Sequence, residues 1–521
     1  MQLLRNFATV SGFTAASRVL GFVRDILVAA VLGAGPVADA FFVAFKLPNL
    51  FRRLFAEGAF NSAFVPLLAR TRAEEGDDGG ERFASSVLSW LLVVVIAVSA
   101  LAMIFTPLLV LALAPGFAAD GNFDLAVLLT RICFPYLAAM SLVAFLSGIL
   151  NTHDRFAAAA FAPVLLNIVL ITALLVAKAL GLPAEASATV LSVGVFVAGV
   201  VQAGLLFVAV RRLGVRLTLP RPRPSPRLKR LLRLGIPGVA AGGITQINIV
   251  AGTIIASFWP GAVSYLYYAD RLYQLPLGIV GIAIGVALLP DLSRRLGQGD
   301  VGGALWTQNR ALEFALMLTL PAAAALIVVP LEIVVPLFER GAFDRKDAAM
   351  TAAALAAYGF GLPAFVLIKV FSPAYFARED TATPMVFAGI SMLVNVGGAV
   401  AFAWMLADDG LPHVGIAAAT SLAGWVNALL LFAGLVRRGD FKPDGTLRWR
   451  TLGFFAASLA LMVVATVIAQ GLNGWFFHAD TLHAALALGA LVAGSIVVFA
   501  LVCELSGAMG VRDLLKAFRK S

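Results

Sequence analysis

Apolar runs long enough to cross a lipid bilayer recur along the whole of this sequence. A hydrocarbon core about 30 Å thick takes about 20 helical residues, and the runs 163–179, 189–210 and 482–503 supply about that length with hardly a charged residue. The chain is 61% hydrophobic and only 13% charged, a balance outside the range of ordinary soluble domains. The sequence therefore predicts an all-α integral membrane protein.

About fourteen transmembrane segments are predicted, and they leave little chain for a soluble domain. Their ranges are 8–33, 37–69, 86–114, 123–150, 157–179, 185–210, 232–258, 262–292, 310–337, 348–376, 383–406, 412–436, 450–470 and 482–504. The first segment contains Arg18, Arg24 and Asp25, which the apolar centre of a cleavable signal would not tolerate. We therefore expect it to be retained as a helix.

The distribution of lysine and arginine predicts the orientation in the membrane. If the N-terminus is cytoplasmic, the cytoplasmic connections and tails contain 27 of the 39 basic residues, and the opposite connections contain 4. Because positive residues accumulate on the cytoplasmic side, both termini are predicted to be cytoplasmic. This topology also accounts for the net charge of +10, so no nucleic-acid partner is needed to explain it.

An internal repeat divides the chain. A shift of about 228 residues places Pro135 on Pro363 and Asn167 on Asn395. Because both copies would start on the cytoplasmic side, the repeat predicts two six-helix lobes of parallel orientation, followed by two additional helices. The predicted divisions are an N-terminal lobe at 1–220, a linker and C-terminal lobe at 221–440, and helices thirteen and fourteen with a tail at 441–521.

Charged residues inside the predicted helices point to a polar interior. About a dozen such charges facing lipid would cost on the order of 30 kcal/mol, so they must face one another or water. Arg131 lies near a helix end, where it can reach the interface. The other members are Arg18, Arg24, Lys46, Arg52, Arg53, Arg271, Lys369, Asp25, Asp39, Glu57 and Asp270.

Seven of these residues are basic and four are acidic. A surplus of arginine suits an anionic ligand, phosphate in particular, because the guanidinium group donates paired hydrogen bonds. This interpretation applies most directly to Arg18, Arg24, Arg52 and Arg271. For the others, including the stripe of Asp39, Lys46, Arg53 and Glu57 on the second helix, a structural role is an equal alternative.

Motifs for covalent chemistry are not found in the sequence. It contains no phosphate-binding loop of the Walker type, no catalytic triad and no carboxylate pair at metal spacing. Cys133 and Cys503 lie in apolar segments, and the four histidines have no partner at the spacing of a zinc site. We expect no enzyme activity, no cofactor and no metal.

Several blocks resemble the MurJ (also called MviN) family of lipid II flippases, in the multidrug/oligosaccharidyl-lipid/polysaccharide exporter superfamily. The blocks are "SRVLGFVRD" (17–25), "ADAFFVAFKLPNLFRRLFAEGAFNSAFVPLLA" (38–69), "FAPVLLN" (161–167), "YYADRL" (267–272) and "LLPDLS" (288–293). The resemblance implies translocation of lipid II, an undecaprenyl-pyrophosphate-linked disaccharide pentapeptide, across the bacterial cytoplasmic membrane by alternating access. It also implies contacts with membrane lipids and with cell-wall synthesis proteins.

The same resemblance suggests a substrate site and leaves questions open. It places Arg18, Arg24, Asp25 and Arg52 at the headgroup, with Arg271 as their partner from the second lobe. The supporting cavity charges would be Asp39, Lys46, Arg53, Glu57, Asp270 and Lys369. Gln274 stands where family members often have Glu, which leaves an inter-lobe ion pair and the coupling ion open.

Other functions remain compatible with the residues. The same scaffold could flip another undecaprenyl-linked oligosaccharide or export organic cations, although a cation exporter would be expected to have an acidic, aromatic cavity. A membrane scaffold that organises wall-synthesis enzymes through its basic loops is a third alternative.

Overall fold

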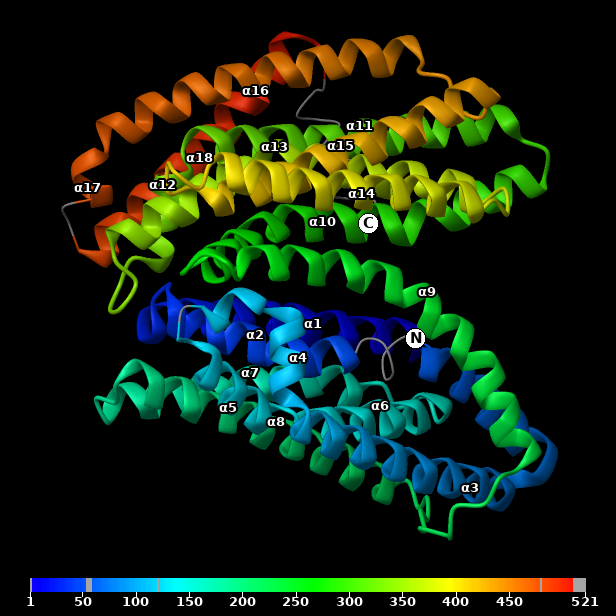
Figure 1. Ribbon diagram of the computed structural model, residues 1–521. Helices are drawn as coiled ribbons and strands as arrows, with labels where there is room; N and C mark the ends of the chain where they lie inside the picture. The colour runs from blue at the N-terminus through cyan, green and yellow to red at the C-terminus, as the bar shows by residue number, and fades with distance from the viewer. Residues whose placement is uncertain (1, 53–58, 120, 478–479, 509–521) are drawn as a thin grey trace. The chain divides into compact units, whose positions relative to one another are not determined.

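The computed structural model describes residues 2–52, 59–119, 121–477 and 480–508, and the elements in this part of the chain are helices. Figure 1 shows how they follow one another along the chain. They form two compact units: residues up to 264 together with 341–343 make unit 1, and 265–340 with the residues from 344 onward make unit 2. The prediction of an all-α fold is confirmed.

Unit 1 is built on the long helices of the first half of the chain. Its elements are α1 (Gln2–Leu32), α2 (Pro36–Arg52), α3 (Ala59–Ile104), α4 (Thr106–Leu113), the 3₁₀ helix η2 (Pro115–Ala118), α5 (Phe123–Cys133), α6 (Tyr136–Thr152), α7 (Ala157–Ala179), α8 (Ala184–Arg212) and α9 (Pro226–Ala256). Helix α1 packs on α7, α7 and α6 pack on α8, and α9 packs on α3 and α4. These contacts group α9 with unit 1, whereas the repeat in the sequence starts a new lobe there; the predicted divisions at 220 and 440 stay predictions.

Unit 2 contains the second half of the chain and its C-terminal helices. Its elements are α10 (Ala262–Gly297), whose first turn lies in unit 1, α11 (Val301–Val328), α12 (Pro330–Phe338), α13 (Arg345–Phe376), α14 (Ala382–Met405), α15 (Pro412–Arg438), α16 (Gly445–Gly471), α17 (Asn473–Phe477) and α18 (Thr481–Leu505). Helix α13 packs on α11 and α15, and α16 packs on α11 and α18. The two helices predicted in addition to the repeat are α16 and α18.

Ten helices or helix pairs in the described part of the chain are long and apolar enough to cross a membrane. They include α7, α8, α14, α16 and α18, whose outward side chains are apolar. Helices α1, α2, α9 and α10 are not among them. Three of these four, α1, α2 and α10, contain charges that the sequence analysis assigns to a polar interior. Each of the fourteen predicted segments overlaps a helix.

Three predicted segments differ in detail from the helices of the structure, and a glycine or a proline lies at each difference. The predicted connection at 70–85 is helical, because α3 continues through it with one break at Gly76, whose φ of 73° lies in the left-handed region that glycine adopts without strain. The predicted helix 123–150 is divided at Pro135, and the predicted helix 310–337 at Pro330. Proline lacks the backbone donor that a continuous helix needs.

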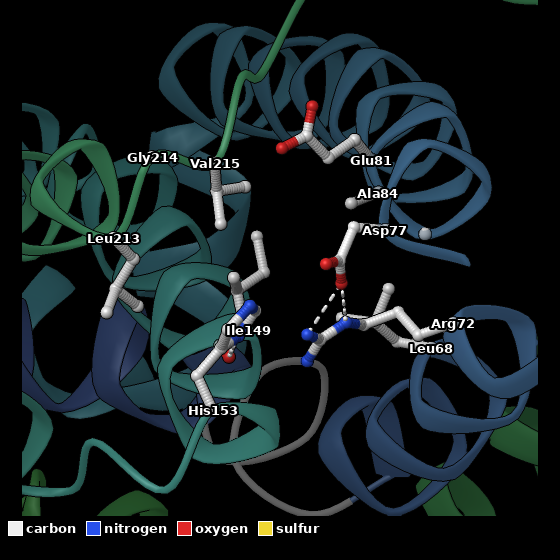
Figure 2. A pocket seen from close by; sticks show the side chains of 11 residues that line it. Leu68, Arg72, Asp77, Glu81, Ala84, Ile149, His153, Leu213, Gly214 and Val215 are labelled. Carbon is white, nitrogen blue, oxygen red and sulfur yellow. Dashed lines mark hydrogen bonds and ion pairs between the residues drawn. The ribbon is translucent and has the colours of Figure 1, made fainter.

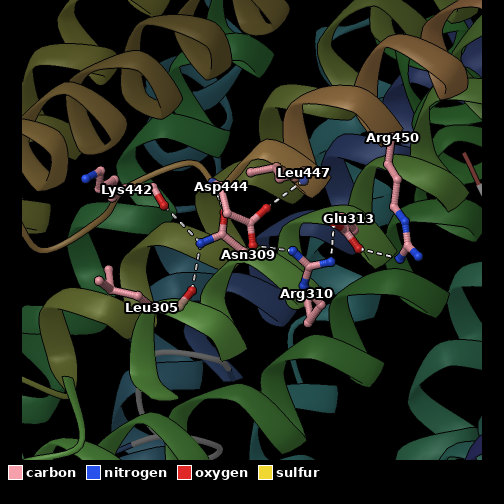
Figure 3. Close-up of polar contacts among 8 residues, drawn as sticks. All are labelled: Leu305, Asn309, Arg310, Glu313, Lys442, Asp444, Leu447 and Arg450. Carbon is pink, nitrogen blue, oxygen red and sulfur yellow. Dashed lines mark hydrogen bonds and ion pairs between the residues drawn. The ribbon is translucent and has the colours of Figure 1, made fainter. Parts of the chain in front are cut away.

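A buried polar network joins α16 to α11 (Figure 3). Glu313, only 5% exposed, forms an ion pair with Arg310 at 2.6 Å and accepts a hydrogen bond from Arg450 at 2.9 Å. Arg310 also contacts Asp444 at 2.5 Å, and the Asp444 backbone N–H donates to the side chain of Asn309 at 3.1 Å. Since Asp444 caps α16 through the Leu447 N–H, these contacts fix the beginning of α16 on α11.

Candidate functional site

The strongest polar cluster among the predicted site residues lies between α1 and α7. Arg24 donates from Nε and Nη2 to one carboxylate oxygen of Asp25, at 3.0 and 2.7 Å. Its remaining nitrogen, Nη1, donates to Asn167 Oδ1 at 3.0 Å. Arg24 is 9% exposed and Asp25 is 2% exposed, so this is a buried ion pair in which the carboxylate balances the guanidinium charge.

Asn167 fixes the other side of this cluster. Its amide Nδ2 donates to the backbone oxygens of Ser17, at 2.9 Å, and of Pro163, at 3.1 Å. These bonds orient the amide so that its oxygen faces Arg24. In the sequence, Asn167 marks the repeat and ends the block at 161–167, and neither observation predicted this role. The available signal was an amide in the otherwise apolar run of residues 157–177.

Arg18 lies on the same helix but in different surroundings. Its side chain is exposed, and no described residue forms a hydrogen bond or an ion pair with it. The first helix therefore carries one arginine that is buried and balanced, Arg24, and one whose donors all face outward, Arg18. An anion that reaches α1 would meet Arg18 without displacing another residue.

Asp39 and Lys46, on α2, contact residues that are distant in sequence. The two carboxylate oxygens of Asp39 accept from the backbone N–H groups of Gly261, at 2.6 Å, and Ser264, at 2.7 Å. Lys46 donates to Thr253 Oγ1 at 2.5 Å. Asp39 is 1% exposed and lies at the N-terminus of α10, where a carboxylate satisfies free amides and the helix dipole favours negative charge. A structural role accounts for Asp39 by itself; its part in a cavity stays a prediction.

The predicted residues of unit 2 lie on α10 and α13. Arg271 stacks on the ring of Tyr267, with its guanidinium carbon 4.6 Å from the ring centre, and donates to the Tyr267 hydroxyl at 3.0 Å. Gln274 donates to Asp270, one turn earlier on α10. Lys369 is exposed, and its stem lies against Gly281. The amide of Gln274 thus donates to Asp270, a bond that an ionised carboxylate at position 274 would have no donor to form.

Part of the predicted site lies outside the described residues. Arg53 and Glu57 fall within the range 53–58, and the side chain of Arg52 at the end of α2 is likewise not among the described side chains. Within unit 1 the structure brings Arg24 and Asp25 together, and within unit 2 Asp270 and Arg271 lie on one turn of α10. The grouping of Arg271 with the arginines of unit 1 stays a prediction.

A separate pocket of about 220 Å³ lies in unit 1 where α3 bends at Gly76 (Figure 2). Arg72 contacts Asp77 at 2.7 Å and donates to the Thr152 backbone oxygen at 3.1 Å. His153 and Glu81 complete the polar lining. None of the predicted substrate residues lines this pocket. We interpret the pocket as a polar gap in the packing between α3, the end of α6 and the residues that follow α8.

Comparison with known proteins decides the family. The family model of the lipid II flippase MurJ matches residues 28–493 of this chain. The chain is 52% identical over 471 residues to a protein of Rhizobium meliloti (strain 1021) named "Probable lipid II flippase MurJ", and the match covers 90% of this chain and 87% of that one. The chain belongs to the MurJ family of lipid II flippases. It is accordingly a multi-pass membrane protein.

Solved structures agree with this assignment. A structure described as "Lipid II flippase MurJ, inward closed conformation" superposes with a TM-score of 0.77 at 26% identity, over 97% of this chain and 99% of that one. An inward-facing multidrug transporter of the MATE family superposes with a TM-score of 0.65 at 16% identity, over 81% of this chain and 94% of the other, which shows a shared fold alone. The match to the family model begins at residue 28 and so does not include Arg18, Arg24 and Asp25, whose part in a substrate site stays a prediction.

Proposed function

We propose that this protein translocates lipid II from the cytoplasmic to the periplasmic leaflet of the bacterial inner membrane by alternating access. The observation that carries the proposal is the 52% identity, over nine-tenths of the chain, to a relative named as a probable lipid II flippase. Lipid II is the substrate, and membrane lipids surround the protein. Cell-wall synthesis proteins are further proposed partners. The transfer makes and breaks no covalent bond, so the protein acts as a transporter and not as an enzyme.

The arginines of α1 supply the chemistry that a pyrophosphate headgroup requires. Guanidinium groups form charge-assisted hydrogen bonds with phosphate oxygens, and such bonds replace the hydration that the headgroup loses. Arg18 is exposed and makes the first contact in this proposal. Arg24 is already oriented by Asp25 and Asn167, so binding exchanges part of its contact with Asp25 for one with a phosphate oxygen. Arg52 and Arg271 belong to the proposed site on sequence grounds.

The orientation of the chain is part of the proposal. Both termini are cytoplasmic in this proposal. The support is that 27 basic residues lie on the cytoplasmic side of the predicted topology and 4 lie on the opposite side. The 228-residue repeat supports two lobes of like orientation, which an alternating-access transporter rocks against each other. A membrane potential then acts on the surplus positive charge of the empty carrier.

The test uses purified protein in vesicles that contain a fluorescent lipid II. Lipid II that reaches the outer leaflet is measured with an external reagent that reacts with the headgroup. We expect the unchanged protein to transfer lipid II, and Arg18→Ala and Arg24→Ala each to lower the rate about ten- to a hundredfold, because each removes charge-assisted hydrogen bonds. Arg437→Ala removes an exposed arginine at the end of α15 and should leave the rate unchanged.

The same vesicles separate the alternatives. Preferential transfer of another undecaprenyl-linked oligosaccharide, or of an organic cation, would replace lipid II as the substrate. Absence of any transfer by the unchanged protein would favour a scaffold. Wild-type rates in both arginine variants would remove Arg18 and Arg24 from the mechanism while leaving the substrate assignment standing.

A further inference from the structure

The connection from α8 to α9 and the beginning of α9 are strongly basic. We call residues 213–233 the strap, of which 226–233 are the first turns of α9; it contains no acidic residue, and its basic residues are Arg216, Arg221, Arg223, Arg227, Lys229, Arg230 and Arg233. Helix α8, long and apolar enough to cross a membrane, ends at Arg212, and the predicted span 232–258 begins where the strap ends. The strap therefore follows a helix that is long and apolar enough to cross a membrane, and it leads into a segment that the sequence predicts to span.

Side chains of α3 fix the backbone of the strap. Glu81 accepts from the Arg216 N–H at 3.0 Å, Ser85 Oγ accepts from the Thr218 N–H at 3.1 Å, and Trp90 Nε1 donates to the Arg223 backbone oxygen at 3.1 Å. The strap is thus an ordered element with an inner side that faces α3. The outer side of the strap is the side that faces away from α3.

The side chain of one basic residue of the strap forms an ion pair with α3, and the side chains of the other six do not. The guanidinium group of Arg227 forms a two-point ion pair with Glu75. The six remaining cations of the strap have exposed side chains, and no described acidic residue forms an ion pair with any of them. Two neighbouring acids of α3 are paired elsewhere, Glu74 with Arg70 and Asp77 with Arg72, and Glu81 binds the backbone of the strap.

Exposed leucines lie among these cations. Leu219 is 66% exposed, Leu232 is 55% exposed and Leu234 is 53% exposed. Leucine next to arginine and lysine, on a segment that directly follows a candidate spanning helix, is the pattern of an interfacial element. The leucines reach the boundary between headgroups and acyl chains, and the basic side chains reach the phosphates.

We propose that the outer side of the strap binds anionic phospholipid, such as phosphatidylglycerol, in the leaflet that it faces. The bound lipid neutralises the exposed cations and holds the strap and the bend of α3 against the membrane surface. The inference depends neither on which side of the membrane the strap faces nor on the transported substrate. It does not involve the residues of the proposed transport site.

The test places a reporter on the strap. Pro222, exposed between two arginines, is replaced in Pro222→Cys and labelled with a small fluorophore; the native Cys133 and Cys503 are 0% and 4% exposed, which keeps them from the reagent. The labelled protein is placed in phosphatidylcholine nanodiscs that contain an equal mole fraction of nitroxide-labelled phosphatidylglycerol or phosphatidylcholine, with the nitroxide near the top of the acyl chain. We expect more than about twofold stronger quenching by the anionic lipid, decreasing at high salt.

A pair of charge-matched variants completes the test. Arg221→Gln, Arg223→Gln and Arg230→Gln, combined, should reduce the ratio to about one, because the cations that attract the anionic lipid are removed. The control combines Arg437→Gln, Lys442→Gln and Arg448→Gln, three exposed cations of unit 2, and should keep the full ratio. Size-exclusion chromatography confirms that both variants are folded. Equal quenching in the unchanged protein, or a preference that survives the strap variant, would overturn the proposal.

Discussion

Arg24 shows how a charged side chain is accommodated within a spanning helix. Its three guanidinium nitrogens are divided between Asp25, on the same helix, and Asn167, on α7. An isolated charge at this position would be costly, and the pair with its amide neighbour removes most of that cost. The arrangement also holds the guanidinium group of Arg24 in one orientation. A ligand with phosphate oxygens can therefore bind it without the entropy cost of ordering the side chain.

This geometry makes a prediction for Arg24→Lys. Lysine retains the charge, but its single ammonium group cannot reach Asp25 and Asn167 in the planar arrangement of the guanidinium group. We therefore expect Arg24→Lys to lose nearly as much lipid II transfer as Arg24→Ala, measured in the same vesicles. At Arg18, where no described residue fixes the side chain, lysine should restore most of the transfer. Full transfer by Arg24→Lys would show that only the charge matters.

At the scale of helices, aspartate side chains repeatedly accept hydrogen bonds from the backbone N–H groups at helix N-termini. Asp39 binds the first amides of α10 from α2, and Asp380 accepts from the Thr383 N–H at the start of α14. Asp344, Asp444 and Asp480 cap α13, α16 and α18 in the same way. Each carboxylate satisfies amides that a helix leaves without partners and lies at the positive end of its dipole.

The hydrogen bonds of Asp39 can be weakened with a minimal change. Asp39→Asn replaces one accepting oxygen with a donor that faces a backbone N–H, so we expect a loss of about 1–2 kcal/mol in the free energy of unfolding. Thermal unfolding of purified protein in detergent measures it. Asp124→Asn, at an exposed carboxylate in the first turn of α5, is the matched control and should change stability by less than about 0.5 kcal/mol. Equal effects of both variants would contradict the capping role.

The hydrogen bonds of Asp380 make a prediction for pH. Hydrogen bonds from Arg438 and Thr383 lower the pKa of Asp380 from its ordinary value of 3.8 to about 2. Because the pKa is lower in the folded state, the stabilisation is fully present above the ordinary value and is lost as the pH falls toward the folded value. Asp380→Asn should therefore lower the unfolding temperature at pH 7, and its difference from the unchanged protein should shrink below about pH 4.

A control distinguishes this group from general acid effects. Asp409→Asn removes an exposed carboxylate near the start of α15, where no described residue forms an ion pair with it. It should leave the unfolding temperature close to that of the unchanged protein across the same pH range. A constant difference for Asp380→Asn between pH 7 and pH 3 would show that the ion pair with Arg438 does not stabilise the fold.

At the scale of the whole molecule, the two helices beyond the repeat are attached by charge as well as by apolar packing. Ala324, Leu461, Ala465 and Leu491 contribute to one buried cluster of α11, α16 and α18. At one end of this contact Glu313 forms ion pairs with arginines of both α11 and α16 (Figure 3). A buried carboxylate between two arginines fixes the register of α16 along α11, which apolar side chains alone specify less strictly.

Glu313→Gln tests this attachment. The substitution retains the size of the side chain but leaves Arg450 without its carboxylate and Arg310 with Asp444 alone, so we expect a loss of about 2–4 kcal/mol in stability. Hydrogen exchange followed by mass spectrometry should show faster exchange in the first turns of α16. Glu185→Gln removes one exposed carboxylate from α8 and serves as the control. Unchanged exchange in α16 would assign its attachment to apolar packing.

The amino-acid sequence by itself determined the class of the protein, the positions of its helices and the presence of a polar interior. These properties are local or additive: a run of apolar residues must span lipid wherever it packs, and each charge within it carries a cost that can be counted. Arg24 and Asp25 were found in this way. The breaks at Pro135 and Pro330 are also local, and they were missed because apolar length was weighed above backbone chemistry. The break at Gly76 lies within the predicted connection, where the helical residues around it were missed.

Only the tertiary structure decided which groups meet. Asn167 lies 143 residues from Arg24, and Gly261 lies 222 residues from Asp39. The grouping of α9 with unit 1 and the ion pair between Glu75 and Arg227 likewise depend on residues that are far apart in the sequence. A hydrogen bond forms only within about 3 Å, and that proximity depends on how whole helices pack, to which residues far apart along the chain all contribute.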